Sequence, residues 1–227
     1  MNYLKKTLIK VPFDELKGVE DMFYRQVQME EDRLMRKFYK QYLETKELCY
    51  SKLEAEAIYS SLKIEKIKDD VIYCEKGIQI PNHMLAEVFN ESDQICIFAE
   101  TIHGYEDLEK ENDNVINQLF LDGWGTALAE CGAVWLKEQI TELLKTKKIY
   151  TTCSWSPGQH SVDITLQHVV FNFLHPEEIG IELNKSCMMH PKKSISGFIG
   201  LGNKKDNELK RACDFCEHRE NCPSAYV

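Results

Sequence analysis

Residues 94–101 read QICIFAET, and this stretch decides which kind of fold the sequence predicts. The apolar run from Ile95 to Ala99 is short and bounded by polar residues, as is typical of a buried strand. Residues 112–145 follow with the strongest helical pattern of the chain, because their apolar side chains recur along one broad face. A buried strand next to a long amphipathic helix predicts a body that mixes α and β structure.

Further elements extend this pattern in both directions. Turn residues within 68–70 and 75–77 divide residues 64–80 into short antiparallel strands, and residues 4–11, 149–153, 179–183 and 194–201 also predict strands. We expect one or two helices in residues 13–46 and short helices over 53–62 and 163–174. Pro81 and Asn82 open another helix, which runs through Phe89.

The order of these elements predicts two parts. We expect an α+β body over residues 1–202, whose N-terminal helical part covers about 12–62. A polar linker at 203–207 then leads into a cysteine-rich, metal-binding tail over residues 203–227. Within the body, Gly123, Gly125 and Gly132 interrupt the long helix, where glycine costs about 1 kcal/mol relative to alanine. They indicate close packing or a bound ligand, and close packing is the commoner cause.

Size and charge exclude several classes of function. The chain has 227 residues, of which 43% are hydrophobic and 29% charged, so it can bury a core. Its net charge of −9 argues against binding to nucleic acid or to an acidic membrane surface. There is no apolar run of the ~18 residues that span a bilayer and no signal-peptide pattern, so we expect a cytoplasmic protein.

The sequence contains 9 cysteines, and three of them form a compact motif near the C-terminus. Cys213, Cys216 and Cys222 have the spacing C-x2-C-x5-C. Thiolates two residues apart can bind one metal from a tight turn, and a third ligand follows a few residues later. The alternative without a metal is three reduced thiols that bind nothing, but such thiols near a tail are prone to oxidation. The spacing therefore favours a metal centre.

A fourth ligand is needed to complete a common metal site. The candidates are Cys187, His190 and His218, of which Cys187 is preferred because four thiolates suit both zinc and a 4Fe–4S cluster. Zinc would make the tail a structural clip, whereas an iron–sulfur cluster would make it an electron relay. A three-cysteine cluster with one open iron is a third case, but the radical AdoMet enzymes that use it have the spacing C-x3-C-x2-C.

The remaining cysteines carry less weight as ligands. Most lie in partly apolar surroundings, where cysteine acts as a small buried residue, and this group comprises Cys49, Cys74, Cys96 and Cys131. The chain also lacks the G-x-S-x-G, P-loop, H-E-x-x-H and G-x-G-x-x-G motifs. The common hydrolase, kinase and dehydrogenase interpretations therefore have no support.

Several short motifs, in a fixed order, indicate a family. They are FAETIHG at residues 98–104, LDGWGTALAE at 121–130, SPG at 156–158, IGIEL at 179–183 and MMHPKKSISG at 188–197. In this order they resemble the activation domain of cobalamin-dependent methionine synthase, and more closely its short stand-alone relatives, some of which end in a cysteine cluster. The resemblance covers roughly residues 60–200.

The resemblance implies a fold, a ligand and a partner. The family's activation domain has a twisted antiparallel sheet with flanking helices, binds S-adenosylmethionine (AdoMet) and docks on a cobalamin domain. Inactive cob(II)alamin is there reduced by one electron and trapped by methyl transfer from AdoMet. Carried over to this chain, the AdoMet loop is residues 154–159, with Ser154, Ser156, Gly158 and Gln159 as the binding residues.

This chain departs from the family pattern in the loop itself. The pattern is Arg-x-x-x-Gly-Tyr, whereas Ser154 stands here at the arginine position and Gln159 at the tyrosine position. Arginine would pair with the AdoMet carboxylate in a charge-assisted contact, which serine cannot provide.

Two functions from different classes follow. The first is an accessory protein that reactivates a cobalamin-dependent methyltransferase. It would use an electron donor, the C-terminal cluster and AdoMet, and the chain would then be one component of a methyltransferase system. The alternative is a non-catalytic module that binds a corrinoid protein or a small ligand, with zinc as a clip. The third possibility is an ordinary scaffold protein that binds no metal.

Overall fold

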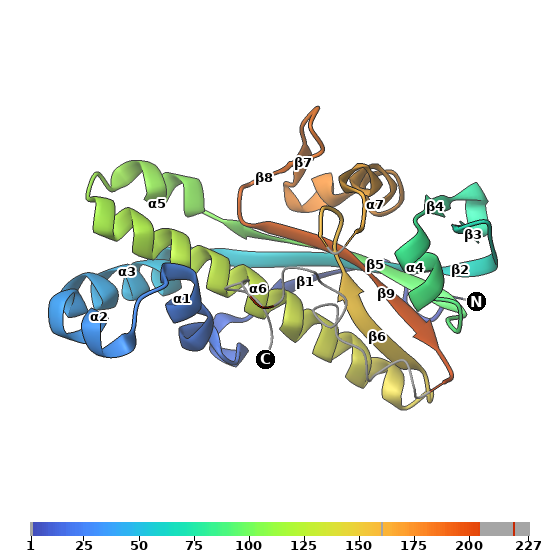
Figure 1. The fold of residues 1–227 in the computed structure, drawn as a ribbon, viewed down its shortest axis with the longest axis horizontal. Helices are drawn as coiled ribbons and strands as arrows, with labels where there is room; N and C mark the ends of the chain where they lie inside the picture. The colour runs from blue at the N-terminus through green and yellow to red at the C-terminus, as the bar shows by residue number, and fades with distance from the viewer. Residues whose placement is uncertain (1, 160, 205–219, 221–227) are drawn as a thin grey trace.

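An antiparallel sheet forms the middle of the molecule, as Figure 1 shows for the computed structural model, which describes residues 2–159, 161–204 and 220. Its strands follow the order β4-β3-β2-β5-β9-β6, and β1 pairs with the first half of β2. The strand bounds are β1 Thr7–Val11, β2 Glu54–Lys68, β3 Val71–Cys74, β4 Gln79–Pro81, β5 Gln94–His103, β6 Tyr150–Trp155 and β9 Ser194–Gly202. A small separate sheet pairs β7 (Glu182–Leu183) with β8 (Met189–His190).

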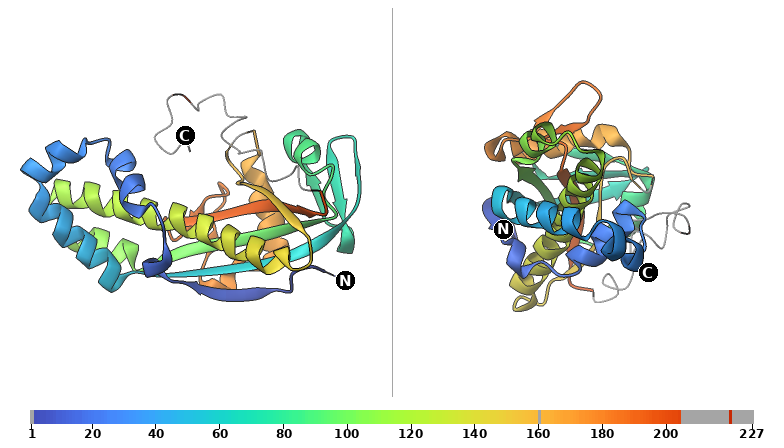
Figure 2. Two further views of the ribbon diagram at one scale, coloured as in Figure 1. Left: turned by 90° about the horizontal axis from the view of Figure 1, so that it is seen from below. Right: turned by 90° about the vertical axis from the view of Figure 1, so that its left-hand side faces the viewer.

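Helices cover both faces of the sheet. The long α6 lies along one face together with α1 and α3, while α7 lies on the opposite face, as the two views of Figure 2 make clear. The helix bounds are α1 Val19–Val27, α2 Glu31–Lys37, α3 Tyr39–Lys52, α4 His83–Val88, α5 Tyr105–Glu111, α6 Val115–Lys145 and α7 Gln167–Leu174. The predicted α+β class, an antiparallel sheet with flanking helices, is confirmed.

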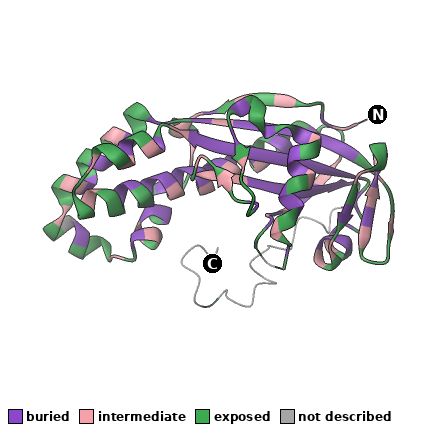
Figure 3. Cartoon of the chain, turned by 90° about the horizontal axis from the view of Figure 1, so that it is seen from above, coloured by how far each residue is buried: buried purple, intermediate pink, exposed green. Residues whose placement is uncertain are grey.

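The central strand β5 divides the core into two clusters, because successive side chains of a strand point to opposite faces. Cys96, Phe98 and Ile102 pack on the α6 side, whereas Ile95 and Ile97 pack on the α7 side. All five are buried, and Figure 3 shows the buried band running along the strands. The prediction of a buried strand at 94–101 is correct, and the strand extends to His103.

The prediction of a short helix over residues 53–62 is wrong, as is the N-terminal helical part about 12–62 where it includes them. The helices end at Lys52, and β2 runs from Glu54 to Lys68. Glu54 and Ala55 favour helix weakly, but β2 pairs with β1 on one edge and with β5 on the other. Satisfying the backbone on both edges outweighs a local preference of a few tenths of a kcal/mol.

Two asparagines cap helix starts: Asn82 does so where the sequence predicts a start, and Asn114 caps α6, which begins at Val115 instead of the predicted residue 112. The Asn82 side chain accepts a hydrogen bond from the Leu85 backbone N–H, and Asn114 accepts from Ile116 and Asn117. Such caps satisfy donors that the first turn leaves without a partner. The predicted strand at 179–183 is only partly present, because residues Pro176–Ile179 form a 3-10 turn before β7. Among residues 2–159 and 161–204, no helix combines the length and apolarity needed to cross a membrane.

The three glycines of α6 are packing positions. A Cβ on Gly123 would lie 2.8 Å from Val27 of α1, and a Cβ on Gly125 would lie 2.9 Å from the Tyr105 ring. At Gly132 the nearest atom is a carboxyl oxygen of Glu100. Each distance is shorter than an ordinary carbon contact, so α6 approaches its neighbours more closely than a larger residue permits. The packing interpretation is confirmed.

Candidate functional site

The predicted loop begins in the edge strand β6 and continues beyond its end. Its pairing with β9 is irregular between Thr151 and Ser154, and Ser154 then pairs with Ile199. Directly paired residues share a face, and Ile199 belongs to the core cluster on the α6 side. Ser154 therefore lies on the α6 face, whereas the next residue, Trp155, is buried in the α7 cluster.

A tight turn follows β6 and fixes Gly158 in a left-handed conformation. The Gln159 N–H donates to the Ser156 carbonyl over 3.1 Å, and the Gly158 N–H donates to the Val162 carbonyl over 2.8 Å. Gly158 has a φ of 88°, and a Cβ there would lie 2.9 Å from Cδ1 of Ile164. Both the backbone angle and the space thus require glycine, and the close approach at this position is made by Ile164 of the chain itself.

A hollow of about 630 Å³ opens where this turn meets the start of α4. Its lining comes from two distant segments, because Pro81 and Asn82 face Gly158, Ser161 and Asp163 across it. A hollow of this volume suits a small organic ligand. Of the four predicted loop residues, Gly158 lines the hollow; Ser156 is half-buried and Gln159 is exposed beside it in sequence, while Ser154 lies on the sheet.

Asp163 and Asn82 are the residues of this hollow that sequence reasoning missed as site residues. Asp163 accepts hydrogen bonds at Oδ1 from the backbone N–H and the hydroxyl of Thr165, over 2.7 and 2.6 Å. These two donors hold the pKa of the Asp163 carboxyl below its ordinary value. Both residues precede helical turns, so their sequence signal is that of a cap, and only the fold places them in one hollow.

A buried acid pair lies on the α6 face of the sheet. Glu100 of β5 is 0% exposed, and neither of its carboxyl oxygens has a hydrogen-bond partner among the described residues. Burial, and then the nearby Glu130 of α6, raise the pKa of Glu100 well above its ordinary value. Burial also raises the pKa of Glu130. A carboxyl buried in the core without a described hydrogen-bond partner is unusual, and the only sequence sign of it is a glutamate in the run FAET.

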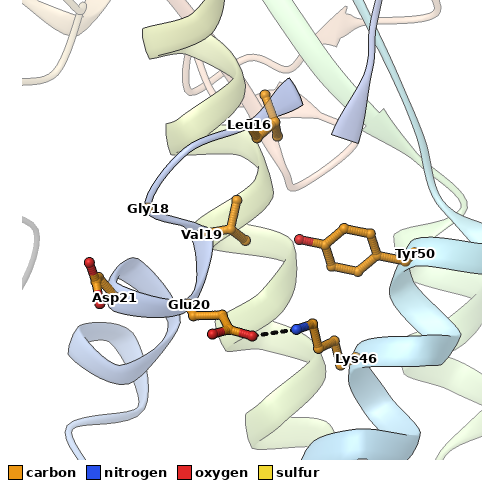
Figure 4. A pocket seen from close by; sticks show the side chains of 7 residues that line it. All are labelled: Leu16, Gly18, Val19, Glu20, Asp21, Lys46 and Tyr50. Carbon is orange, nitrogen blue, oxygen red and sulfur yellow. Dashed lines mark hydrogen bonds and ion pairs between the residues drawn. The ribbon is translucent and has the colours of Figure 1, made fainter. Parts of the chain in front are cut away.

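A second hollow, of about 360 Å³, lies between α1 and α3 (Figure 4). Lys46 reaches into it and forms an ion pair with Glu20, which also accepts a hydrogen bond from the Tyr42 hydroxyl over 3.0 Å. The Lys46 Nζ lies 5.7 Å from the centre of the Trp124 ring. Because Lys46 is engaged by these neighbours, the charges of this hollow serve the packing of α1 on α3.

The structure places one of the four predicted metal ligands. Cys187 is buried, and its Sγ lies 3.4 Å from Nε2 of His168 on α7. Cys213, Cys216 and Cys222 lie outside the described residues, so the four-thiolate site stays a prediction. Within the described ranges, no group of three or more His, Cys, Asp or Glu side chains is arranged to hold a metal ion.

Four other cysteines are buried in the core. Burial raises the pKa of the Cys49 and Cys74 thiols to about 12 and that of Cys131 to about 11, and raises that of Cys96 as well. A thiol with so high a pKa carries almost no thiolate at neutral pH, and thiolate is the form that binds metals. These positions, predicted to be small buried residues, are indeed buried.

Comparison with known proteins shows first a shared fold and then a family. A structure described as "Crystal Structure of the MetH Reactivation Domain bound to AdoHcy" superposes with a TM-score of 0.68 and 13% identity, covering 93% of this chain and 83% of that chain. The family described as "Vitamin B12 dependent methionine synthase, activation domain" matches residues 75–207, more than half of the chain. The chain therefore belongs to this activation-domain family, which confirms the resemblance. No protein of curated function matches significantly.

Proposed function

We propose that this chain is an accessory protein for the reductive reactivation of a cobalamin- or corrinoid-dependent methyltransferase. The observation that carries the proposal is the family match over residues 75–207. An activation domain implies a partner that holds the cobalamin, so we expect a separate corrinoid protein to dock on this chain. We further expect this to occur in the cytosol, with an external electron donor.

AdoMet is the methyl donor that we propose for the reaction, bound near the loop of residues 154–159. Two observations support it: the similar reactivation domain was solved with AdoHcy, and the hollow beside Gly158 has the volume of a small-ligand site. The chain's residues fit the ligand unevenly. Ser154 offers a neutral hydroxyl where the family pattern has arginine, so the contact to the amino-acid carboxylate loses its charge assistance.

For the tail we propose a metal centre held by Cys213, Cys216 and Cys222, with Cys187 as the fourth ligand. Cys187 lies 3.4 Å from Nε2 of His168, so this part of the fold would contribute at most these two side chains, a thiolate and an imidazole, which are both zinc and cluster ligands. An iron–sulfur cluster would supply the electron that reactivation needs. Zinc would instead favour the alternative function, a binding module with a structural clip.

The first experiment is anaerobic purification followed by a visible spectrum and metal analysis. Broad absorption with about four irons per chain supports the electron-relay proposal, whereas about one zinc and no colour supports the clip. Cys216→Ser and Cys187→Ser should each reduce the metal content, and Cys153→Ser, which changes a half-buried cysteine outside the proposed site, should not. Full metal content in Cys187→Ser would remove Cys187 from the site.

The second experiment tests reactivation directly. The protein, a cob(II)alamin-loaded methyltransferase and a one-electron reductant are mixed with AdoMet, and the corrinoid absorbance is followed. We expect methylcobalamin and one equivalent of AdoHcy, because the electron gives cob(I)alamin, which then takes the methyl group. If the spectrum changes neither with nor without AdoMet for any corrinoid partner tried, the proposed function is wrong.

A further inference from the structure

One end of the molecule exposes a group of apolar side chains. Helices α3 and α6 both begin there, and the ring of Phe38, just before α3, contacts the ring of Phe120 near the start of α6, with centroids 6.2 Å apart. Four large apolar side chains at these two helix starts are 40% to 75% exposed: Tyr39, Leu43, Val115 and Leu119. A single exposed apolar residue is ordinary, whereas a group at one end of a protein is typical of an interaction surface.

The α2 side of this end is basic. Residues 33–43 contain no acid and four cations, all of them exposed: Arg33, Arg36, Lys37 and Lys40. Three acids at 30–32 precede them at the start of α2, where the helix dipole favours negative charge. Lys40 forms an ion pair with Glu44 over 3.6 Å, but none of the ion pairs between described residues involves Arg33 or Lys37. These two cations are therefore available to a partner.

The α5 side of the same end is acidic. Residues 107–113 contain one cation and four acids, which are Asp107, Glu109, Glu111 and Asp113. Asp107 pairs with Lys110 over 3.8 Å, and Glu109 pairs with Lys192. Glu111 and Asp113 are exposed, and the ion pairs within the described part of the chain include neither of them. Two anions on this side thus match the two available cations on the α2 side.

The arrangement of these two sides suits a second copy of the same chain. Helices α2 and α5 lie on opposite sides of the start of α6, as Figures 1 and 2 both show. A two-fold axis through the apolar group would therefore place α2 of each copy against α5 of the other, because a symmetric interface uses the same surface twice. Opposite charges would then meet in both contacts. A partner of one charge sign would match only half of this end.

We propose that this end is the interface of a symmetric homodimer. Its centre is formed by the exposed apolar side chains at the starts of α3 and α6, and its two outer contacts each join the basic α2 of one copy to the acidic α5 of its partner. An apolar centre with a charged rim is the usual anatomy of a protein interface. The inference goes beyond the proposed function, because it depends on neither AdoMet nor the metal centre.

The test is analytical ultracentrifugation of the full chain and of two charge-reversed double variants. Arg33→Glu with Lys37→Glu makes both sides acidic, and Glu111→Lys with Asp113→Lys makes both sides basic. We expect a monomer–dimer equilibrium for the native protein in the micromolar range and dimerisation at least about tenfold weaker in each variant alone. An equimolar mixture of the two variants should form dimers again, because opposite charges then meet in both contacts.

A matched control separates this interface from a general effect of net charge. Lys66→Glu with Lys68→Glu changes the net charge by the same amount as the acidic variant, but it lies in the part of β2 that pairs with β3, at the other end of the molecule (Figure 1). Both lysines are exposed. We expect this control to dimerise like the native protein, and circular dichroism should show the same melting temperature for all variants within a few degrees.

A further variant tests the apolar centre. Val115 is the first residue of α6, where a negative charge suits the helix dipole, so Val115→Glu preserves the helix while placing like charges opposite each other across the axis. We expect Val115→Glu to dimerise at least about tenfold more weakly than the native protein.

Four results would each overturn the interface. They are a native protein that stays monomeric up to about 100 μM, a control variant that weakens dimerisation as much as the charge-reversed variants, a mixture of those variants that forms no dimers, and unchanged dimerisation of Val115→Glu. None of these results would refute the proposed function, which the corrinoid reactivation assay tests separately.

Discussion

Gly132 of α6 lies directly against Glu100 of β5, and a Cβ at Gly132 would clash with Oε1 of that carboxyl. The Glu100 carboxyl thus occupies the space that a side chain at position 132 would need. The pair lets a long helix lie flat on a strand that carries a carboxylic acid toward it. Glu100 is fully buried and has no described hydrogen-bond partner. The contact therefore has two consequences: it limits the size of the residue at position 132, and it keeps the Glu100 carboxyl away from water.

Replacement of Gly132 by alanine tests the packing constraint. Alanine ordinarily stabilises a helix by about 1 kcal/mol relative to glycine, but here the new methyl group must displace Glu100 or shift α6. We expect Gly132→Ala to lower the free energy of unfolding by about 1–3 kcal/mol in urea titration. The same change in a Glu100→Ala background should be neutral or stabilising, and an equal loss in both backgrounds would contradict the contact.

The pH dependence of stability tests the electrostatic constraint. The pKa of Glu100 is raised in the folded protein above its ordinary value of 4.5, so the folded state binds the proton more tightly than the unfolded state. Stability is therefore highest below that ordinary value and falls as the pH rises toward the folded-state pKa. We expect Glu100→Gln to remove most of this fall, measured as the free energy of unfolding from pH 4.5 to pH 8.

Glu130 is the matched control for this measurement. Its pKa is also raised by burial, but the side chain is only half-buried, so Glu130→Gln should remove a smaller part of the pH dependence. A native protein whose stability rises between pH 5 and pH 8 would show that other carboxylates outweigh the pair; if Glu100→Gln left that profile unchanged, the buried neutral acid would be refuted.

The loop after β6 gives a prediction with a built-in comparison. Gly158 and Gly77 both have positive φ angles, of 88° and 74°, but a Cβ meets Ile164 at 2.9 Å only at Gly158, while at Gly77 nothing lies within 4 Å. Alanine in this backbone region costs about 1–2 kcal/mol. We expect that loss for Gly77→Ala, a larger one for Gly158→Ala, and a change in ligand binding for Gly158→Ala alone. If both variants lost the same free energy of unfolding in urea, the Ile164 side chain would be able to move away from the new methyl group without cost.

Asn82 should contribute more than an ordinary helix cap. Asn114 caps α6 through two backbone N–H groups, whereas Asn82 caps α4 and also donates to the Ser161 carbonyl. Asn114→Ala should cost about 0.5–2 kcal/mol, and Asn82→Ala should cost about 1 kcal/mol more. Hydrogen exchange supplies the sharper readout: the Gly158 and Val162 amides should exchange faster in Asn82→Ala and not in Asn114→Ala.

Local patterns determined much of this protein in advance. The bounded apolar run at 94–101, the helical stripe of 112–145 and the cap at Asn82 are signals over a few residues, and each gave the right element because local and tertiary preferences agree there. The ordered motifs likewise indicated the family, which the family match over residues 75–207 confirms. The C-terminal thiolate site rests on spacing alone and stays a prediction.

Tertiary structure decided what depends on residues far apart in sequence. Residues 53–62 became strand because β1 and β5 satisfy both edges of β2, a condition that no local window contains. The pKa of Glu100 is raised because α6 covers its carboxyl at Gly132, and Asp163 and Asn82 share a hollow because the loop after β6 folds onto the start of α4. The helix or strand propensity of a segment depends on residues that are close along the chain. The burial of a side chain, its pKa and the shape of a hollow depend on residues that are close in space.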